Sequence, residues 1–91
     1  MKIRIRALIS GRVQGVNFRF YTKVFVDRVG VTGWVRNLDD GRVEVVAEGG
    51  EEKINKLINY LHKGPILARV DNVEIIKEQY KGEFESFEIR F

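Results

Sequence analysis

Hydrophobic and polar residues alternate over the first nine positions of the chain, which is typical of a β-strand with one buried face. The apolar positions of this strand are Ile3, Ile5, Ala7 and Ile9. From Phe18 onward the apolar spacing changes to three and four residues. The positions that follow it are Phe18, Tyr21, Thr22, Phe25, Val26 and Val29. They predict an amphipathic helix that ends at Gly30, with a loop over residues 11–17 before it.

Four more segments alternate in the same way or are rich in β-branched and aromatic residues, and we expect them to be strands. They cover residues 31–38, 42–48, 70–78 and 84–91. The run Asp39-Asp40-Gly41 between the first two predicts a β-hairpin. A second helix is predicted over residues 51–63. Its first turn is acidic, its last turn is basic, and Gly64-Pro65 follows it directly.

The predicted order of elements is β-α-β-β-α-β-β. This is an α+β fold of the ferredoxin-like, split βαβ type with one additional strand at the C-terminal end. Right-handed crossovers place both helices on one face of a mainly antiparallel sheet. No linker, repeat or low-complexity tract interrupts the pattern, so we expect residues 1–91 to form a single domain. This topology serves many functions and does not identify one.

The residue inventory argues against several classes of chemistry. The chain has no Cys and a single His, His62, which is expected to be structural at the end of the second helix. A disulfide framework, a thiolate nucleophile and a Cys-based or His-rich metal site are therefore excluded. The carboxylates of Asp39, Asp40, Glu51 and Glu52 fall in a predicted turn and a helix start. We accordingly expect neither a metal nor a cofactor.

Hydropathy also bears on location. The longest stretch without a charged residue is residues 29–35, which is too short to span a membrane. The first six residues interleave charged and apolar side chains and lack the apolar region of a secretory signal. The expected location is the cytoplasm.

The net charge of +3 is distributed unevenly along the chain. Residues 1–42 hold nine Lys and Arg against three Asp and Glu, whereas residues 43–91 hold seven against ten. An anionic ligand is therefore expected to bind to the first half.

The segment from Gly11 to Arg19, with the sequence GRVQGVNFR, joins a predicted strand to the start of a predicted helix. Backbone N–H groups in a first helical turn lack partners and lie at the positive end of the helix dipole, so they can hold a phosphate. Gly15 allows the tight turn that such a loop needs. Arg19 would oppose the dipole unless an anion lay nearby, and its guanidinium can bind two phosphate oxygens. The alternative is an ordinary strand-to-helix turn with a solvated arginine.

Asn37 is the second candidate for a functional residue, because Asn is depleted in strands and this one lies near the end of a predicted strand. Its amide could accept a hydrogen bond from a water and donate one to a substrate oxygen. The alternative is a local backbone cap before the turn. Four aromatic residues could form a stacking platform, but we expect them to be core residues instead. They are Trp34, Phe18, Tyr21 and Phe25.

The segment from Gly11 to Arg19 resembles the signature loop of the acylphosphatase family. A second group of residues is similar to the family's other pattern in type and spacing: Gly33, Trp34, Val35, Arg36, Asn37, Gly41, Val43 and Gly49. Further similar positions are Gly64, Pro65, Ala68 and Val70. Asn17 replaces a common Gly, at a variable position, and Asp39 stands where Pro is frequent. The resemblance extends over nearly the whole chain.

The resemblance implies hydrolysis of acyl phosphates to a carboxylate and inorganic phosphate, on a ferredoxin-like sandwich. It implies that Arg19 binds the phosphoryl oxygens and that Asn37 positions the attacking water. The loop amides that would bind phosphate with Arg19 belong to Gly15, Val16, Asn17, Phe18 and Arg19. The family uses neither a metal nor a covalent enzyme intermediate. The expected partner is a small acyl phosphate, with no nucleic acid and no membrane, and a monomer is expected.

Two other functions share part of the pattern. An RNA-binding module would have the same topology, the sequence pI is about 9.4, and Arg4 and Arg6 project from the first strand. Against it, residues 42–48 contain no aromatic residue and carry Glu44 and Glu48, where an RNA-recognition motif has a basic and aromatic run. The other function is that of a free relative of the acylphosphatase-like domain in larger carbamoyl-transferring maturation proteins. The chain length favours a free acylphosphatase over a relative of that domain.

Overall fold

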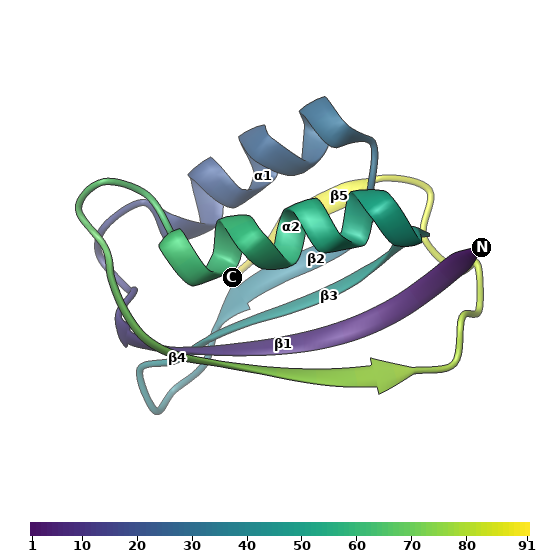
Figure 1. The fold of residues 1–91 in the computed structure, drawn as a ribbon. Coiled ribbons are helices and arrows are strands. Elements are labelled where there is room, and N and C mark those ends of the chain that lie inside the picture. The colour runs from purple at the N-terminus through teal and green to yellow at the C-terminus, as the bar shows by residue number, and fades with distance from the viewer.

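The computed structural model describes residues 1–91, and its helices and strands follow one another in the predicted order. They are β1 (Lys2–Arg12), α1 (Phe18–Val29), β2 (Thr32–Asn37), β3 (Val43–Gly50), α2 (Glu51–Lys63), β4 (Arg69–Glu78) and β5 (Phe87–Arg90). Both helices lie on the same face of one sheet (Figure 1). Neither helix is long and apolar enough to cross a membrane. The predicted ferredoxin-like, α+β fold class is confirmed.

The sheet has the strand order β4-β1-β3-β2-β5. All neighbouring strands pair antiparallel except β2 and β5, which are parallel. Because β2 and β5 are parallel, their carboxyl ends lie side by side at the same end of the strands. The chain reaches β5 by crossing from the β4 edge of the sheet to the opposite edge through residues 79–86.

The core lies between the sheet and the two helices, and it uses the apolar positions that alternate along β1. Ile5, Ala7 and Ile9 are 1% exposed or less, and Leu57 of α2 is fully buried. Further members of the core are Phe18, Val26, Val35, Val43, Val45, Ala47, Ile54 and Leu61. The alternation in the strands and the three- and four-residue spacing in the helices therefore mark the buried faces, except at Tyr21 of α1.

Every strand differs from its predicted limits by a residue or more, and β1 and β5 differ most. β1 continues through Gly11 and Arg12 into the predicted loop, because these residues pair with Val70 and Arg69 of β4 across a bulge. Gly11 has φ 127°, and a side chain there would collide with the Arg69 carbonyl. β5 begins at residue 87 and not at residue 84, because the residues before it belong to the crossing from β4.

Two aromatic residues lie outside the core that was predicted for them. Tyr21 is 45% exposed on α1. Trp34 is buried but lies on the face of the sheet opposite to the helices, since its neighbour Val35 takes the core side. The guanidinium carbons of Arg36 and Arg90 lie 5.0 and 4.6 Å from the Trp34 ring centre. Two cations therefore cover this ring, with the geometry of cation–π contacts.

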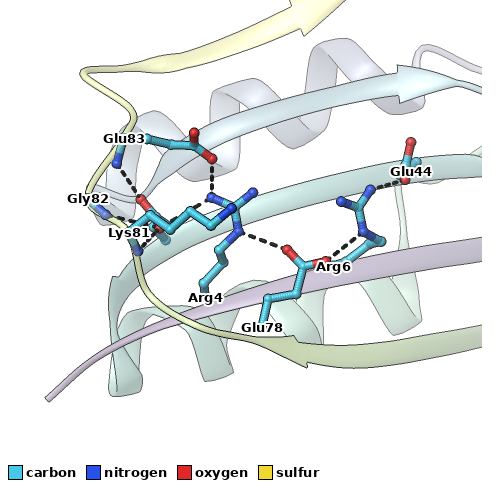
Figure 2. Close-up of polar contacts among 8 residues, drawn as sticks. Arg4, Arg6, Glu44, Glu78, Lys81, Gly82 and Glu83 are labelled. Carbon is cyan, nitrogen blue, oxygen red and sulfur yellow. Dashed lines mark hydrogen bonds and ion pairs between the residues drawn. The ribbon is translucent and has the colours of Figure 1, made fainter.

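Arg4 and Arg6 of β1 lie on the open face of the sheet and are paired there with carboxylates (Figure 2). The Nε atoms of both donate to the Glu78 carboxylate, at 2.8 and 2.9 Å, and Arg6 also pairs with Glu44. Hydrogen bonds from Arg4 and then Arg6 hold the pKa of Glu78 below its usual value. The two arginines on which the RNA-binding alternative relied are thus neutralised by neighbouring strands.

Glu48 of β3 anchors the crossing between β4 and β5. Its carboxylate accepts hydrogen bonds from the backbone N–H groups of Lys81, Gly82 and Glu83, at 2.7, 3.2 and 3.1 Å, and from Arg4 at 3.4 Å. Burial opposes ionisation, but these hydrogen bonds lower the pKa of Glu48 below its ordinary value. The crossing is therefore fixed to the sheet a few residues before β5 begins (Figure 2). This role of Glu48 was not predicted from the sequence.

Candidate active site

The β1–α1 loop (residues 13–17) turns through two residues with left-handed backbone. Gly15 has φ 75°, and Asn17, the residue before α1, has φ 62° and ψ 29°. Among side-chain residues Asn is one of the few that adopts this region readily, which explains Asn at a position where Gly is common. The Asn17 side chain does not cap α1, and no acidic residue lies in the first turn. The positive end of the helix is therefore uncompensated by local side chains.

Arg19 lies in this first turn and is directed toward the end of β5. Its Nη1 donates to the carbonyl oxygen of Arg90 at 3.2 Å, and its guanidinium carbon lies 4.7 Å from the Phe91 ring centre. The hydrogen bond uses one of the five N–H donors of the guanidinium, so most donors remain for a ligand. Arg19 has no carboxylate partner, unlike Arg4, Arg6 and Arg36.

Arg19 and Asn37 line the same hollow, which has a volume of about 300 Å³. It is lined by Val13, Gly15, Asn17, Phe18, Arg19, Phe20, Asn37, Ile89 and Phe91. Of the predicted site residues, only Val16 is not part of the lining, and its side chain is 5% exposed. The lining contains one cationic side chain and no carboxylate side chain. An anion would therefore be attracted without competition from a negative side chain.

Ile89 and Phe91 were not predicted as site residues. They reach the hollow because β5 pairs parallel to β2 with Arg90 opposite Arg36, which places the end of β5 beside Asn37. The alternation of Phe87, Ile89 and Phe91 predicts that these side chains share one face of the strand. It does not predict which strand lies beside them. Strand pairing over such a sequence separation leaves no local signal.

Gln14 joins the β1–α1 loop to the β2–β3 turn (residues 38–42). Its Nε2 donates to the carbonyl oxygens of Leu38 and Arg42, both at 2.8 Å. Leu38 directly follows Asn37, so this amide links the loop that carries Arg19 to the strand end that carries Asn37. Gln14 belongs to the segment from Gly11 to Arg19, but no role was predicted for it. Its partners are distant in sequence, so no local pattern reports the contact.

The chemistry that these residues can supply is anion binding and orientation of polar groups. No group of three or more His, Asp or Glu side chains is placed to hold a metal ion. His62 is exposed in the last turn of α2, as predicted, and does not line the hollow. The site offers a guanidinium, uncapped helix amides and the Asn37 amide, but no acid–base side chain.

The chain is similar to known proteins over nearly its whole length. A family model described as Acylphosphatase matches residues 5–89. The acylphosphatase of Syntrophobacter fumaroxidans is 48% identical over 90 residues, which cover 99% of this chain and 93% of that one. The acylphosphatase of Geobacter sulfurreducens is 47% identical over the full length of both chains. The crystal structure of acylphosphatase from Bacillus subtilis has a TM-score of 0.94 at 31% identity, covering 98% of this chain and 99% of that one. By sequence and by structure, this chain belongs to the acylphosphatase family of enzymes.

Proposed function

We propose that the chain hydrolyses acyl phosphates to a carboxylate and inorganic phosphate in the hollow between the β1–α1 loop and the end of β2. One observation carries this proposal. Arg19, at the uncapped start of α1, and Asn37, at the end of β2, line one hollow that contains no carboxylate side chain.

Phosphate binding is assigned to Arg19 and to the loop amides of residues 15–19. A cation in the first turn of a helix costs about 0.3–1 kcal/mol, because it opposes the helix dipole. A phosphoryl group between them reverses this cost, since it is attracted by both the guanidinium and the amides. Two N–H groups of a guanidinium can bind two phosphoryl oxygens at once.

Asn37 is assigned to the attacking water. Its amide oxygen can accept a hydrogen bond from the water, and its amide N–H can donate to a phosphoryl oxygen. The water is then held in line with the bond that breaks. Phosphoryl transfer depends mainly on such positioning and on stabilisation of charge on the equatorial oxygens.

The lining contains no general base, so we assign the proton of the water to a phosphoryl oxygen of the substrate. The leaving group is a carboxylate, which is a weak base and needs no strong general acid. Water adds to phosphorus, the bond from phosphorus to the acyl oxygen breaks, and the electron pair leaves with the carboxylate. The scheme needs no metal and no covalent enzyme intermediate.

The test is hydrolysis of benzoyl phosphate in the presence of a chelator, with inhibition by inorganic phosphate measured in parallel. Arg19→Ala should lose both turnover and phosphate inhibition. Asn37→Ala should lose turnover by roughly 100- to 1000-fold, as when an oxyanion donor is removed, while phosphate still inhibits any residual activity and still stabilises the fold. Arg28→Ala, at the other end of α1, and Asn55→Ala, on the exposed side of α2, are the matched controls. Near wild-type turnover in Asn37→Ala would contradict the role of Asn37 in positioning water, and activity lost on adding chelator would contradict the metal-free scheme.

A further inference from the structure

The hollow that holds Arg19 and Asn37 has an aromatic side. Phe20 and Phe91 both line it, and both are largely exposed, at 55% and 101%. The exposed part of an aromatic side chain gains none of the stabilisation that burial gives in the core. Grouped beside a polar ligand site, they mark a surface that a ligand can cover.

We propose that Phe20 and Phe91, together called the acyl wall, bind the acyl part of the substrate and favour aromatic and other apolar acyl phosphates over acetyl phosphate. This inference rests on the proposed function. In an acyl phosphate a single oxygen joins the acyl carbon to phosphorus. When the phosphoryl group is bound at Arg19, the acyl group therefore lies in the same hollow, beside the aromatic side chains of the acyl wall.

The placement of both rings supports this assignment. Phe20 directly follows Arg19 in α1, and its ring packs edge-on against Tyr21, with the ring centres 5.3 Å apart and the planes at 72°. Phe91 lies over the Arg19 guanidinium, with 4.7 Å from the guanidinium carbon to its ring centre. Each ring thus has one contact beside the cation that would bind phosphate. The acyl wall comes from two elements, α1 and the end of β5.

The size of the hollow also fits. Its volume of about 300 Å³ lies at the lower end of the range for small-molecule sites, roughly 300–1,000 Å³. It can hold a phosphoryl group with a compact acyl substituent. An acetyl group is too small to contact much of two aromatic rings, whereas a benzoyl group offers a ring of its own for stacked or edge-on contact.

The test compares kcat/KM for benzoyl phosphate and acetyl phosphate in the wild type, Phe20→Ala and Phe91→Ala. Loss of Phe91 also removes a contact of Arg19 and should slow both substrates. The ratio of kcat/KM for benzoyl phosphate to kcat/KM for acetyl phosphate is independent of this shared effect, so it reports on contacts with the acyl group alone. Leu67→Ala is the control, because Leu67 is 68% exposed in the segment after α2 and does not line the hollow. Inhibition by inorganic phosphate is measured for Phe20→Ala, to report on the phosphoryl site alone.

We expect the wild type to prefer benzoyl phosphate, and each aromatic variant to lower the benzoyl-to-acetyl ratio by about 2- to 10-fold, the range of one aromatic contact. Leu67→Ala should keep the wild-type ratio, and Phe20→Ala should keep the wild-type inhibition by phosphate. An unchanged ratio in both aromatic variants, or an equal fall in Leu67→Ala, would overturn the acyl wall and leave the proposed function intact. Failure of the wild type to hydrolyse either substrate would overturn the proposed function and the acyl wall with it.

Discussion

Replacing Gln14 with Met removes the two hydrogen bonds that join the β1–α1 loop to the β2–β3 turn, while keeping the length of the side chain. Each bond is 2.8 Å long, between neutral groups, and contributes roughly 1 kcal/mol net. Both carbonyls keep a backbone donor, since Gly41 N–H bonds to Leu38 and Leu38 N–H bonds to Arg42. No acceptor is left without a partner, so the expected loss in free energy of unfolding is about 2 kcal/mol.

The effect of Gln14→Met on catalysis should exceed its effect on binding. Arg19 and the loop amides share one segment, whereas Asn37 belongs to another that Gln14 holds in register with it. A displacement of about 1 Å between reacting groups can cost roughly 100-fold in rate. We therefore expect kcat for benzoyl phosphate to fall by about 10- to 100-fold, with a smaller change in the inhibition constant of phosphate.

The assay combines steady-state kinetics at 25 °C with urea unfolding, where the loss should move the midpoint by about 1 M. Gln79→Met is the matched control, because Gln79 is exposed in the crossing from β4 and does not line the hollow. A kcat within twofold of the wild type, at the expected loss of stability, would refute the positioning role and leave Gln14 with a structural one. An unchanged midpoint would refute the energetic reasoning.

Three further results are expected. Glu48→Gln should lower the free energy of unfolding at pH 7 by about 1.5–3 kcal/mol, because hydrogen bonds to a charged acceptor are replaced by weaker ones. Since the folded pKa of Glu48 lies below its ordinary value of 4.5, the stability it contributes is present above that value and is lost as pH falls through the folded pKa. The difference from the wild type should therefore shrink in acid, and a difference that does not depend on pH would contradict this, with Glu85→Gln as the exposed control. Asn17→Ala should unfold more easily than Asn17→Gly by about 1–2 kcal/mol in urea, because Ala at φ 62° is strained, and equal stabilities would contradict the strain. Phosphate at 100 times its dissociation constant should stabilise the wild type and Asn37→Ala by about 2.7 kcal/mol in thermal unfolding, and a similar gain in Arg19→Ala would contradict its role in binding.

The fold could be predicted from the sequence because its signals are local. The alternation along β1 and the apolar face of α2 each depend on neighbouring residues, and the helix limits followed from them. The limits that were wrong depend on distant partners. β1 is longer because Gly11 pairs with Val70, and β5 is shorter because Glu48 holds the residues before it.

The same division applies to the site. Arg19 and the loop amides lie in one continuous segment, so its residue types and spacing indicated an anion site. Asn37 was predicted as a candidate from its position at a strand end, and it lines the same hollow as Arg19. Gln14, Ile89 and Phe91 acquire their roles only when β2 pairs with β5 and the β2–β3 turn meets the loop. A sequence shows such side chains without showing which of them meet.

Charge shows most clearly what folding adds. By sequence, the first 42 residues carry a large basic excess, which suggested an anion site somewhere in that half. In the structure, antiparallel pairing brings Glu44 and Glu78 against β1, and Arg4 and Arg6 are neutralised there. Arg19 is different because its neighbours are a carbonyl oxygen and an aromatic ring. The attraction for an anion therefore comes from one cation without a carboxylate partner, at an uncapped helix start, and not from the excess of charge in the half that contains it.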